Sequence, residues 1–241
     1  AYGGYDGRKD RPRYPDHGFF HLALPKMLRQ EDPTRYYQPS SPYSPDGLPP
    51  GAADAGDQHP WVVGMRNLNF HDYRELQCRF PVEGGILGPP ALPTLLACLP
   101  EGQRTVQSFA WQVHDNSVDS WGEPSFPDQM IAQWLGKDIR QLAVEEFAYW
   151  GGLVHGEGLR EYCENFRRRM YDTASAIFWM YNDTWPASRS WTIVDYYLRR
   201  TPAFYQVRRA MRPVHVVLAE QDGRVDVFGI NETQDLLSAT V

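Results

Sequence analysis

Glu83 is the carboxylate in this sequence whose setting best suits catalysis. It ends an apolar run, RFPVE, and two glycines followed by ILGPP come after it. In β/α barrels the C-terminal ends of the strands form the active-site face, and glycines leave room for a ligand beside a carboxylate. The sequence therefore predicts that Glu83 lies at a strand end and faces a substrate. The alternative is a surface glutamate in a turn.

A second group of candidates lies at the end of an apolar segment, SAIFWMYND, and in the residues just after it. Trp179 comes late in that segment, and Asn182, Asp183 and Trp185 follow it. Aromatic faces stack on the apolar side of a pyranose, while amide and carboxylate groups hydrogen-bond its hydroxyls. These residues therefore predict a sugar subsite. The alternatives are core packing for the two tryptophans and a helix N-cap or turn for the other two residues.

A third candidate segment is GDQHPW, in which His59 stands two residues before Trp61. At a strand start, this histidine can hydrogen-bond a carboxylate or a substrate; the alternative is a structural histidine beside an aromatic ring. His114 and His155 are weaker candidates. The sequence contains no HExxH, GxSxG or phosphate-binding loop, so zinc peptidase, serine hydrolase and nucleotide-binding functions lack support.

Composition excludes several other classes of protein. The chain has 241 residues, with 24 basic and 30 acidic side chains and a net charge of -6, and it has no basic stripe, so we expect no nucleic-acid partner. No run approaches the roughly 18 apolar residues of a membrane span, and no signal peptide is recognised, so no membrane partner is expected and the compartment stays open. Three cysteines suit neither a disulfide framework nor a zinc site, and we expect no metal and no cofactor.

The elements that must position these residues alternate between short apolar segments and helices. Such alternation is typical of parallel β/α units, hence of an α/β fold. The predicted strands cover residues 36–42, 61–65, 78–85 and 175–183. The predicted helices cover residues 19–30, 92–99, 138–169 and 193–209, with Pro25 and Pro202 as interruptions or first-turn residues.

The sequence changes character after Arg212. VHVVLAE and RVDVFGI flank QDG, which is typical of a β-hairpin. We therefore expect a domain boundary near residue 212, with residues 1–212 forming an α/β domain and residues 213–241 beginning an all-β domain.

In order along the chain, these segments resemble the family 2 glycoside hydrolases, in the branch of β-mannosidases and exo-β-glucosaminidases. LPKMLRQEDPTRYYQPSSPYSPDG resembles a helix, strand and loop of that branch, and GDQHPWVVG resembles a further strand segment. RFPVEGG is similar to the strand that carries the nucleophile. The most specific match is LREYCENFRRRMYDTASAIFWMYNDTWPASRSWTIVDYY. The resemblance covers nearly the whole chain up to about residue 212.

This resemblance implies that residues 1–212 form the C-terminal half of a (β/α)₈ TIM barrel and residues 213–241 the first strands of an immunoglobulin-like β-sandwich. It implies a nucleophile at Glu83, on the seventh strand, and a sugar-lining tryptophan at Trp179, on the eighth. The loop of Asn182, Asp183, Trp185 and Pro186 follows. The activity implied is that of a retaining exo-β-glycosidase, which removes terminal β-mannosyl or β-glucosaminyl residues from a glycoside or oligosaccharide by double displacement.

Two departures from the family pattern matter. VEGG stands where the family commonly has SEFG, which shifts the resemblance towards the glucosaminidases. The acid/base glutamate of the family, in an Asn-Glu pair ending the fourth strand, would lie before Ala1, and the one such pair here is Asn231-Glu232. We therefore expect a fragment that needs the N-terminal half of its enzyme and is inactive alone. The alternatives are a non-catalytic sugar-binding remnant and a structural module.

Overall fold

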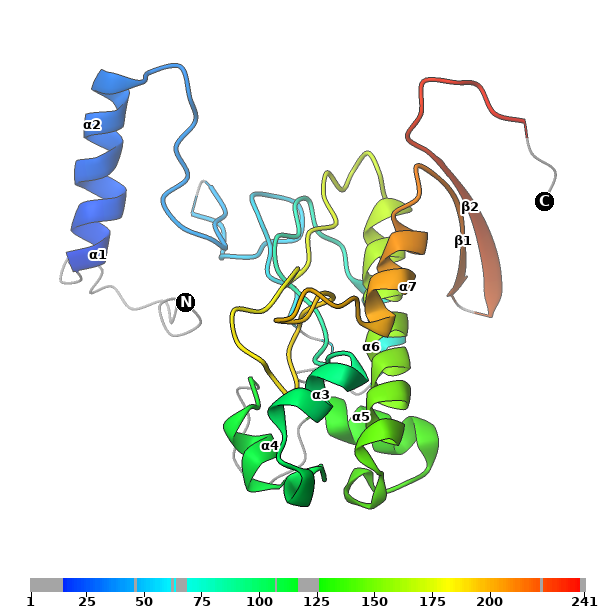
Figure 1. The fold of residues 1–241 in the computed structure, drawn as a ribbon. Coiled ribbons are helices and arrows are strands. Elements are labelled where there is room, and N and C mark those ends of the chain that lie inside the picture. Colours follow the sequence, from blue (N-terminus) through cyan, green and yellow to red (C-terminus); the bar gives the residue numbers. More distant parts are fainter. Residues whose placement is uncertain are drawn as a thin grey trace.

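The central element of the fold is α6 (Val144–Arg167), a 24-residue helix in the middle of the computed structural model (Figure 1). The structure describes residues 15–45, 47–61, 63, 69–106, 108–116, 126–221 and 223–238. Glu146 Oε2 accepts a hydrogen bond from the Ala143 backbone N–H at 3.1 Å, which satisfies one donor at the helix start. No described helix, α6 included, combines the length and apolar character needed to cross a bilayer.

Much of α6 is buried, and α7 (Pro202–Ala210) packs along it (Figure 1). Phe147, Leu159 and Phe166 of α6 are at most 1% exposed and belong to the hydrophobic core. Gly152 allows the two helices to approach closely, because a Cβ there would lie 2.6 Å from Cγ of Pro202. The predicted helix at 138–169 is thus confirmed in its main part, and besides α7 it packs against the segments Phe70–Glu75, Leu92–Cys98 and Phe126–Leu135.

The remaining helices are shorter. They are α1 (Pro15–His17), α2 (Leu24–Glu31), α3 (Leu92–Cys98), α4 (Phe109–Val113) and α5 (Phe126–Leu135), together with a π-helical segment at Gly18–Ala23 and 3₁₀ turns at Phe70–Glu75, Glu101–Gln103 and Ile139–Gln141. The helices predicted at 19–30 and 92–99 are confirmed. The helix predicted from residue 193 is wrong at its start, because α7 begins at Pro202, which suits a first helical turn.

Three extended segments lie side by side and run parallel. Gln58 N–H donates to Phe80 O at 3.1 Å, and Gln58 and Pro81 form a parallel bridge. Further along the chain, Ala174 N–H donates to Arg79 O and Trp179 N–H to Gly84 O, both at 2.9 Å. The constant spacing between these partners shows that the segments share one direction.

The segments predicted as strands at 36–42, 78–85 and 175–183 are extended or irregular and are not regular strands. Prolines explain part of this, since Pro39, Pro42 and Pro81 have no N–H to donate to a neighbouring strand. The prediction at 61–65 falls largely on residues outside those described. Among the described residues, a closed barrel is not present.

The predicted hairpin after residue 212 is confirmed. Strands β1 (Val214–Gln221) and β2 (Arg224–Asn231) pair antiparallel, with Val214 opposite Asn231 and Gln221 opposite Arg224. Polar contacts attach the hairpin region to α6: His215 Nε2 lies 2.9 Å from Glu164 Oε1, and a guanidinium nitrogen of Arg167 lies 2.9 Å from Glu232 Oε2. Val217 and Ile230 of the hairpin are buried, whereas Leu218 remains exposed.

Candidate functional site

Glu83 lies at the centre of a small cluster of polar contacts. Its side chain is 30% exposed, and its Oε2 accepts a hydrogen bond from Trp61 Nε1 at 3.2 Å. His59 Nδ1 lies 3.3 Å from the same oxygen, and the imidazole is 6% exposed. The structure therefore brings together three of the residues singled out from the sequence. It leaves part of the carboxylate accessible to solvent.

The contacts continue beyond His59 to a buried carboxylate. His59 Nε2 lies 2.7 Å from Ser41 Oγ, and that hydroxyl donates a short hydrogen bond to Asp57 Oδ2. Asp57, which is 4% exposed, also accepts hydrogen bonds on Oδ1 from Gln38 Nε2 at 2.8 Å and from the Tyr43 backbone N–H at 2.7 Å. Sequence reasoning missed Ser41 and Asp57. Their signal was the acidic residue two positions before His59 in GDQH.

The backbone explains why these side chains meet. Gln58 N–H donates to Phe80 O, and Val82 N–H donates to Gln58 O at 3.0 Å, so His59 and Glu83 follow paired residues of parallel segments. On the other side, Gly84 O accepts a hydrogen bond from Trp179 N–H. Both glycines after Glu83 are required for a steric reason. A Cβ on Gly84 would lie 2.6 Å from Cε2 of Tyr162, and a Cβ on Gly85 would lie 2.5 Å from the carbonyl oxygen of Trp179.

Trp179 therefore lies on the segment beside Glu83, and its side chain is not in the core. The residue is 43% exposed, and a cis peptide bond joins it to Met180. A second tryptophan nearby, Trp191, was not singled out from the sequence. Its ring centroid lies 6.3 Å from that of Trp61, with the rings nearly perpendicular. Because Trp61 donates to Glu83, the aromatic and carboxylate groups are linked through this ring contact.

Asn182 and Asp183 occupy different environments. Asn182 is exposed, whereas Asp183 is 6% exposed and accepts hydrogen bonds from Ser190 Oγ and Thr192 Oγ1, both at 2.7 Å. Burial raises the pKa of the Asp183 carboxyl, and the two hydroxyl donors oppose that rise. Both oxygens of Asp183 are thus engaged within its own loop, which favours a role in holding the loop.

Trp185 lies on the same loop and is 47% exposed. Its ring stacks on His114, with centroids 5.0 Å apart and planes 23° from parallel. His114 is held in turn by Pro186, whose carbonyl oxygen lies 2.7 Å from Nδ1. The histidine that the sequence marked as a weak candidate therefore supports the tryptophan.

A buried ion cluster anchors the end of this loop. Arg189 is 4% exposed, and its guanidinium contacts the carboxylates of Asp115 and Asp128, with Nε 3.1 Å from both oxygens of Asp115. The two carboxylates raise the pKa of Arg189 against the opposing effect of burial. Charges buried in this way need their partners, so the cluster ties the loop to the segment around α4 and α5.

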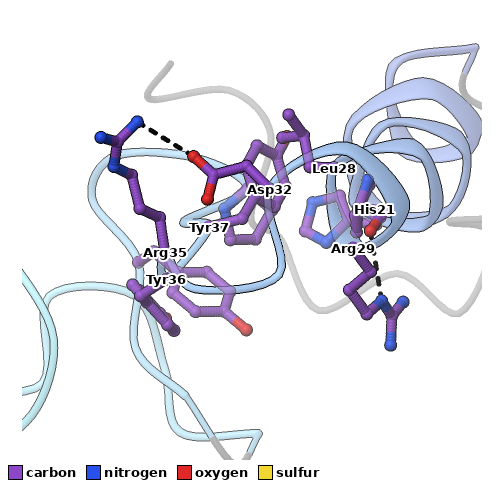
Figure 2. Close-up of a pocket in the computed structure, with 10 residues that line it drawn as sticks. His21, Leu28, Arg29, Asp32, Arg35, Tyr36 and Tyr37 are labelled. Atoms are coloured by element: carbon purple, nitrogen blue, oxygen red, sulfur yellow. Dashed lines mark hydrogen bonds and ion pairs between the residues drawn. The ribbon is translucent and has the colours of Figure 1, made fainter.

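A pocket of about 370 Å³ lies elsewhere, between α2 and the segment that follows it (Figure 2). Its lining includes His21, Leu28, Tyr36 and Tyr37, and an ion pair of 2.9 Å joins Asp32 to an Arg35 guanidinium nitrogen at its rim. None of the predicted site residues lines this pocket. We place the candidate site at Glu83, where the polar contacts converge.

Metal-assisted chemistry has no obvious site in the part of the chain that the structure describes. There, no three side chains of the types His, Cys, Asp and Glu are grouped so that they could hold a metal ion. What the arrangement around Glu83 offers is a partly exposed carboxylate with two ring nitrogens beside one of its oxygens. Such a group can act as a nucleophile or can stabilise a positive charge.

Comparison with known proteins gives relatives over most of the chain, although no family model matches it. β-Mannosidase B of Aspergillus terreus is 30% identical over 209 residues, and that of Thermothelomyces thermophilus is 32% identical over 212 residues. Each match covers 84% of this chain and 24% of the relative. The chain therefore spans about a quarter of the length of these relatives.

Solved structures agree with the sequence matches. A β-D-mannosidase from Dictyoglomus thermophilum superposes with a TM-score of 0.78 at 28% identity, covering 90% of this chain and 26% of that one. An exo-chitosanase from Amycolatopsis orientalis, at 18% identity and a TM-score of 0.54, covers 81% of this chain and 23% of its own; it shares the fold. The chain is thus a homologue of β-mannosidases over most of its length, and the resemblance to family 2 glycoside hydrolases is confirmed.

Proposed function

We propose that this chain supplies the nucleophile side of the active site of a retaining exo-β-glycosidase. The observation that carries this proposal is the Glu83 carboxylate. It follows a parallel extended segment, is partly exposed, and has Trp61 Nε1 and His59 Nδ1 within 3.3 Å of Oε2. A carboxylate held by contacts on one oxygen keeps the other oxygen oriented for attack.

Among the residues that the structure describes, the Glu83 carboxylate contacts Trp61 and His59 through Oε2, so we assign the attack on the anomeric carbon to Oε1. Retaining glycosidases use two carboxyl groups about 5–5.5 Å apart. The first forms a glycosyl ester while the second protonates the departing oxygen. Water then cleaves the ester with the second group acting as base, and the product keeps its configuration.

The second carboxyl group and the domain organisation belong to the same proposal. An Asn-Glu pair, which provides the acid/base in the family, is absent from the sequence before Glu83, so we assign that role to residues outside this chain. Residues 1–212 would then form the C-terminal half of a (β/α)₈ barrel, and residues 213–241 would begin a β-sandwich. The three parallel extended segments and the β-hairpin support this division.

We assign sugar binding to two exposed rings, Trp179 on the segment beside Glu83 and Trp185 on the loop that follows that segment. Trp179 and Trp185 each expose more than two fifths of their surface, which suits stacking on a pyranose, and Asn182 is exposed between them in sequence. Asp183 holds the loop through Ser190 and Thr192. Because the relatives with higher identity are β-mannosidases, terminal β-mannosides are the first substrates to test, with β-glucosaminides second.

The test is hydrolysis by the protein at its full natural length. Aryl β-mannosides, aryl β-glucosaminides and the matching disaccharides are assayed, and the first product anomer is identified by NMR. We expect release of the β-anomer, and release of the α-anomer would contradict the retaining mechanism. Residues 1–241 alone should not cleave disaccharides, because lack of general-acid help costs roughly 10²–10⁴-fold. Turnover of disaccharides by this segment alone would show that it contains its own acid.

A further inference from the structure

We infer that Ser41 and Asp57 are positioning residues that fix which nitrogen of His59 carries a proton beside Glu83. The four side chains form one continuous line of contacts, from Asp57 Oδ2 through Ser41 Oγ and the His59 ring to Glu83 Oε2. This inference rests on the proposed role of Glu83 as nucleophile. It adds Ser41 and Asp57, neither of which touches the Glu83 carboxylate, to the groups on which that role depends.

The direction in which these hydrogen bonds are donated is set at the buried end of the line, by Asp57. Asp57 receives hydrogen bonds from Gln38 Nε2, the Tyr43 backbone N–H and Ser41 Oγ, which is the pattern of an ionised, acceptor-only carboxylate. The Ser41 hydroxyl hydrogen is therefore committed to Asp57. The lone pairs of the same oxygen then face His59 Nε2 at 2.7 Å, so Nε2 must be the donor in this contact.

This polarity limits what His59 can do for Glu83. A neutral imidazole carries one N–H, and here that hydrogen is on Nε2. Nδ1, 3.3 Å from Glu83 Oε2, then has two states. In the neutral ring Nδ1 carries no hydrogen and can accept the proton of a neutral Glu83, and in the imidazolium it can donate to an ionised Glu83. The contacts with Ser41 and Asp57 exclude the neutral tautomer that has its hydrogen on Nδ1, so His59 can donate to an ionised Glu83 only as the imidazolium.

A single substitution should reverse the direction of hydrogen-bond donation along these side chains without moving them. In Asp57→Asn the amide oxygen stays where Gln38 and Tyr43 donate, and the amide nitrogen replaces Oδ2. That nitrogen donates to Ser41, whose hydroxyl hydrogen then turns to His59 Nε2. The neutral imidazole must now carry its hydrogen on Nδ1. Ser41→Ala removes the acceptor at Nε2 and leaves the tautomer unfixed.

The direct test is ¹⁵N NMR of histidine-labelled protein at full natural length, with the His59 signals assigned by their loss in His59→Gln. We expect Nε2 to be protonated across the pH range in the wild type, and to be unprotonated at neutral pH in Asp57→Asn. A wild-type Nε2 without a proton would overturn the inference. So would an unchanged proton pattern in both Asp57→Asn and Ser41→Ala, and the serine variant decides the matter if the asparagine variant does not fold.

Kinetics test whether the tautomer matters for catalysis. We expect Ser41→Ala to lower kcat by roughly 10–100-fold with KM little changed, the range seen when partners that orient a metal-ligating histidine are removed. Ser44→Ala is the matched control, because Ser44 is also buried and bonds to the backbone at Ala52 and Ala55. It should keep wild-type kcat, and equal losses in both variants would reduce Ser41 to a structural role.

The NMR readout separates this inference from the proposed function, since it needs no turnover. If the proton pattern follows the prediction while Glu83→Gln remains fully active, the nucleophile assignment fails and the positioning role fails with it. If Glu83 is essential but Nε2 is unprotonated, the proposed function stands and the positioning role of Ser41 and Asp57 is wrong.

Discussion

The two sides of the candidate site are held in place by opposite means. On the carboxylate side the functional groups themselves are bonded, with Glu83 in contact with Trp61 and His59. On the aromatic side Trp179 and Trp185 stay 43% and 47% exposed, while three polar residues that follow Trp179 are buried and bonded to one another, Asp183 with Ser190 and Thr192. The contacts on the carboxylate side hold the reacting group itself, whereas those on the aromatic side hold the loop that follows Trp179 and carries Trp185.

The difference follows from the chemistry proposed for each side. A nucleophile needs one position and one charge state, which polar contacts supply, whereas a stacking surface must leave its apolar face open. The two sides are joined by two backbone hydrogen bonds between Gly88 and Ser190, of 2.8 and 2.9 Å. Beneath this junction lies His155, whose Nδ1 would be 2.3 Å from a Cβ on Gly88.

The largest effect is expected on the carboxylate side, from Glu83→Gln. The amide keeps the shape of the side chain but cannot form the glycosyl ester, so kcat should fall by roughly 10⁴-fold or more. The measurement is hydrolysis of an aryl β-mannoside, with the melting temperature as control. A variant that melts like the wild type and retains more than a few per cent of its rate would place the nucleophile elsewhere.

The junction should be sensitive to acid through His155. This imidazole is completely buried and has no hydrogen-bond partner on either nitrogen among the residues that the structure describes, and burial lowers its pKa from 6.5 to about 3. The unfolded chain therefore binds a proton below pH 6.5 that the folded chain does not. The free energy of unfolding should fall by up to about 1.4 kcal/mol per pH unit from pH 6.5 towards 3.

Urea unfolding at several pH values measures this effect. His155→Leu should flatten the decline below pH 6.5, because the group that protonates on unfolding is gone. His71→Leu is the control, since the His71 side chain is 44% exposed, and it should keep the wild-type slope. The same slope in all three proteins would show that His155 does not limit stability in acid.

On the aromatic side, Trp179→Ala tests whether an exposed ring binds sugar. Loss of a stacking contact should weaken transition-state binding, which kcat/KM measures, by about 1–3 kcal/mol, with a small change in melting temperature. Trp134→Ala is a matched control, because Trp134 is 49% exposed but stacks on Phe70. A large drop in melting temperature with unchanged kinetics would assign Trp179 to packing.

The smallest effect is expected where the two sides touch, at Trp61. Trp61→Phe removes the N–H that Glu83 Oε2 accepts and keeps an aromatic ring beside Trp191. Transition-state binding, which kcat/KM measures, should weaken by about 1 kcal/mol, the net value of a typical hydrogen bond. Equal kcat/KM values for the variant and the wild type would mean that His59 alone orients the carboxylate.

Much of this arrangement could be predicted from the sequence, because local patterns determine it. The long helix shows in the periodicity of 138–169, the hairpin in the QDG turn, and Glu83 in the apolar run and glycines around it. Regular strands were wrongly predicted at 36–42 and 78–85, because proline removes the donors that a strand needs.

The missed residues depend on contacts that are remote in the sequence. Ser41 and Asp57 meet His59 through segments 16 to 18 residues apart. The sequence predicts Asp183 as a sugar-binding group, and the hydroxyl groups seven and nine residues away that hold it in its loop are seen only in the structure. Apart from the acidic residue before His59 in GDQH, no local pattern marks such partners, since their identity depends on how the segments pack.

The most direct test of Glu83 as nucleophile is covalent trapping at full natural length. An activated 2-deoxy-2-fluoro-β-mannoside slows breakdown of the glycosyl-enzyme, so the labelled carboxylate can be found by peptide mapping. If Glu83 is the nucleophile, we expect one label per chain, on the peptide that contains Glu83, and no label in Glu83→Gln. A label on another carboxylate of the wild-type protein would contradict it.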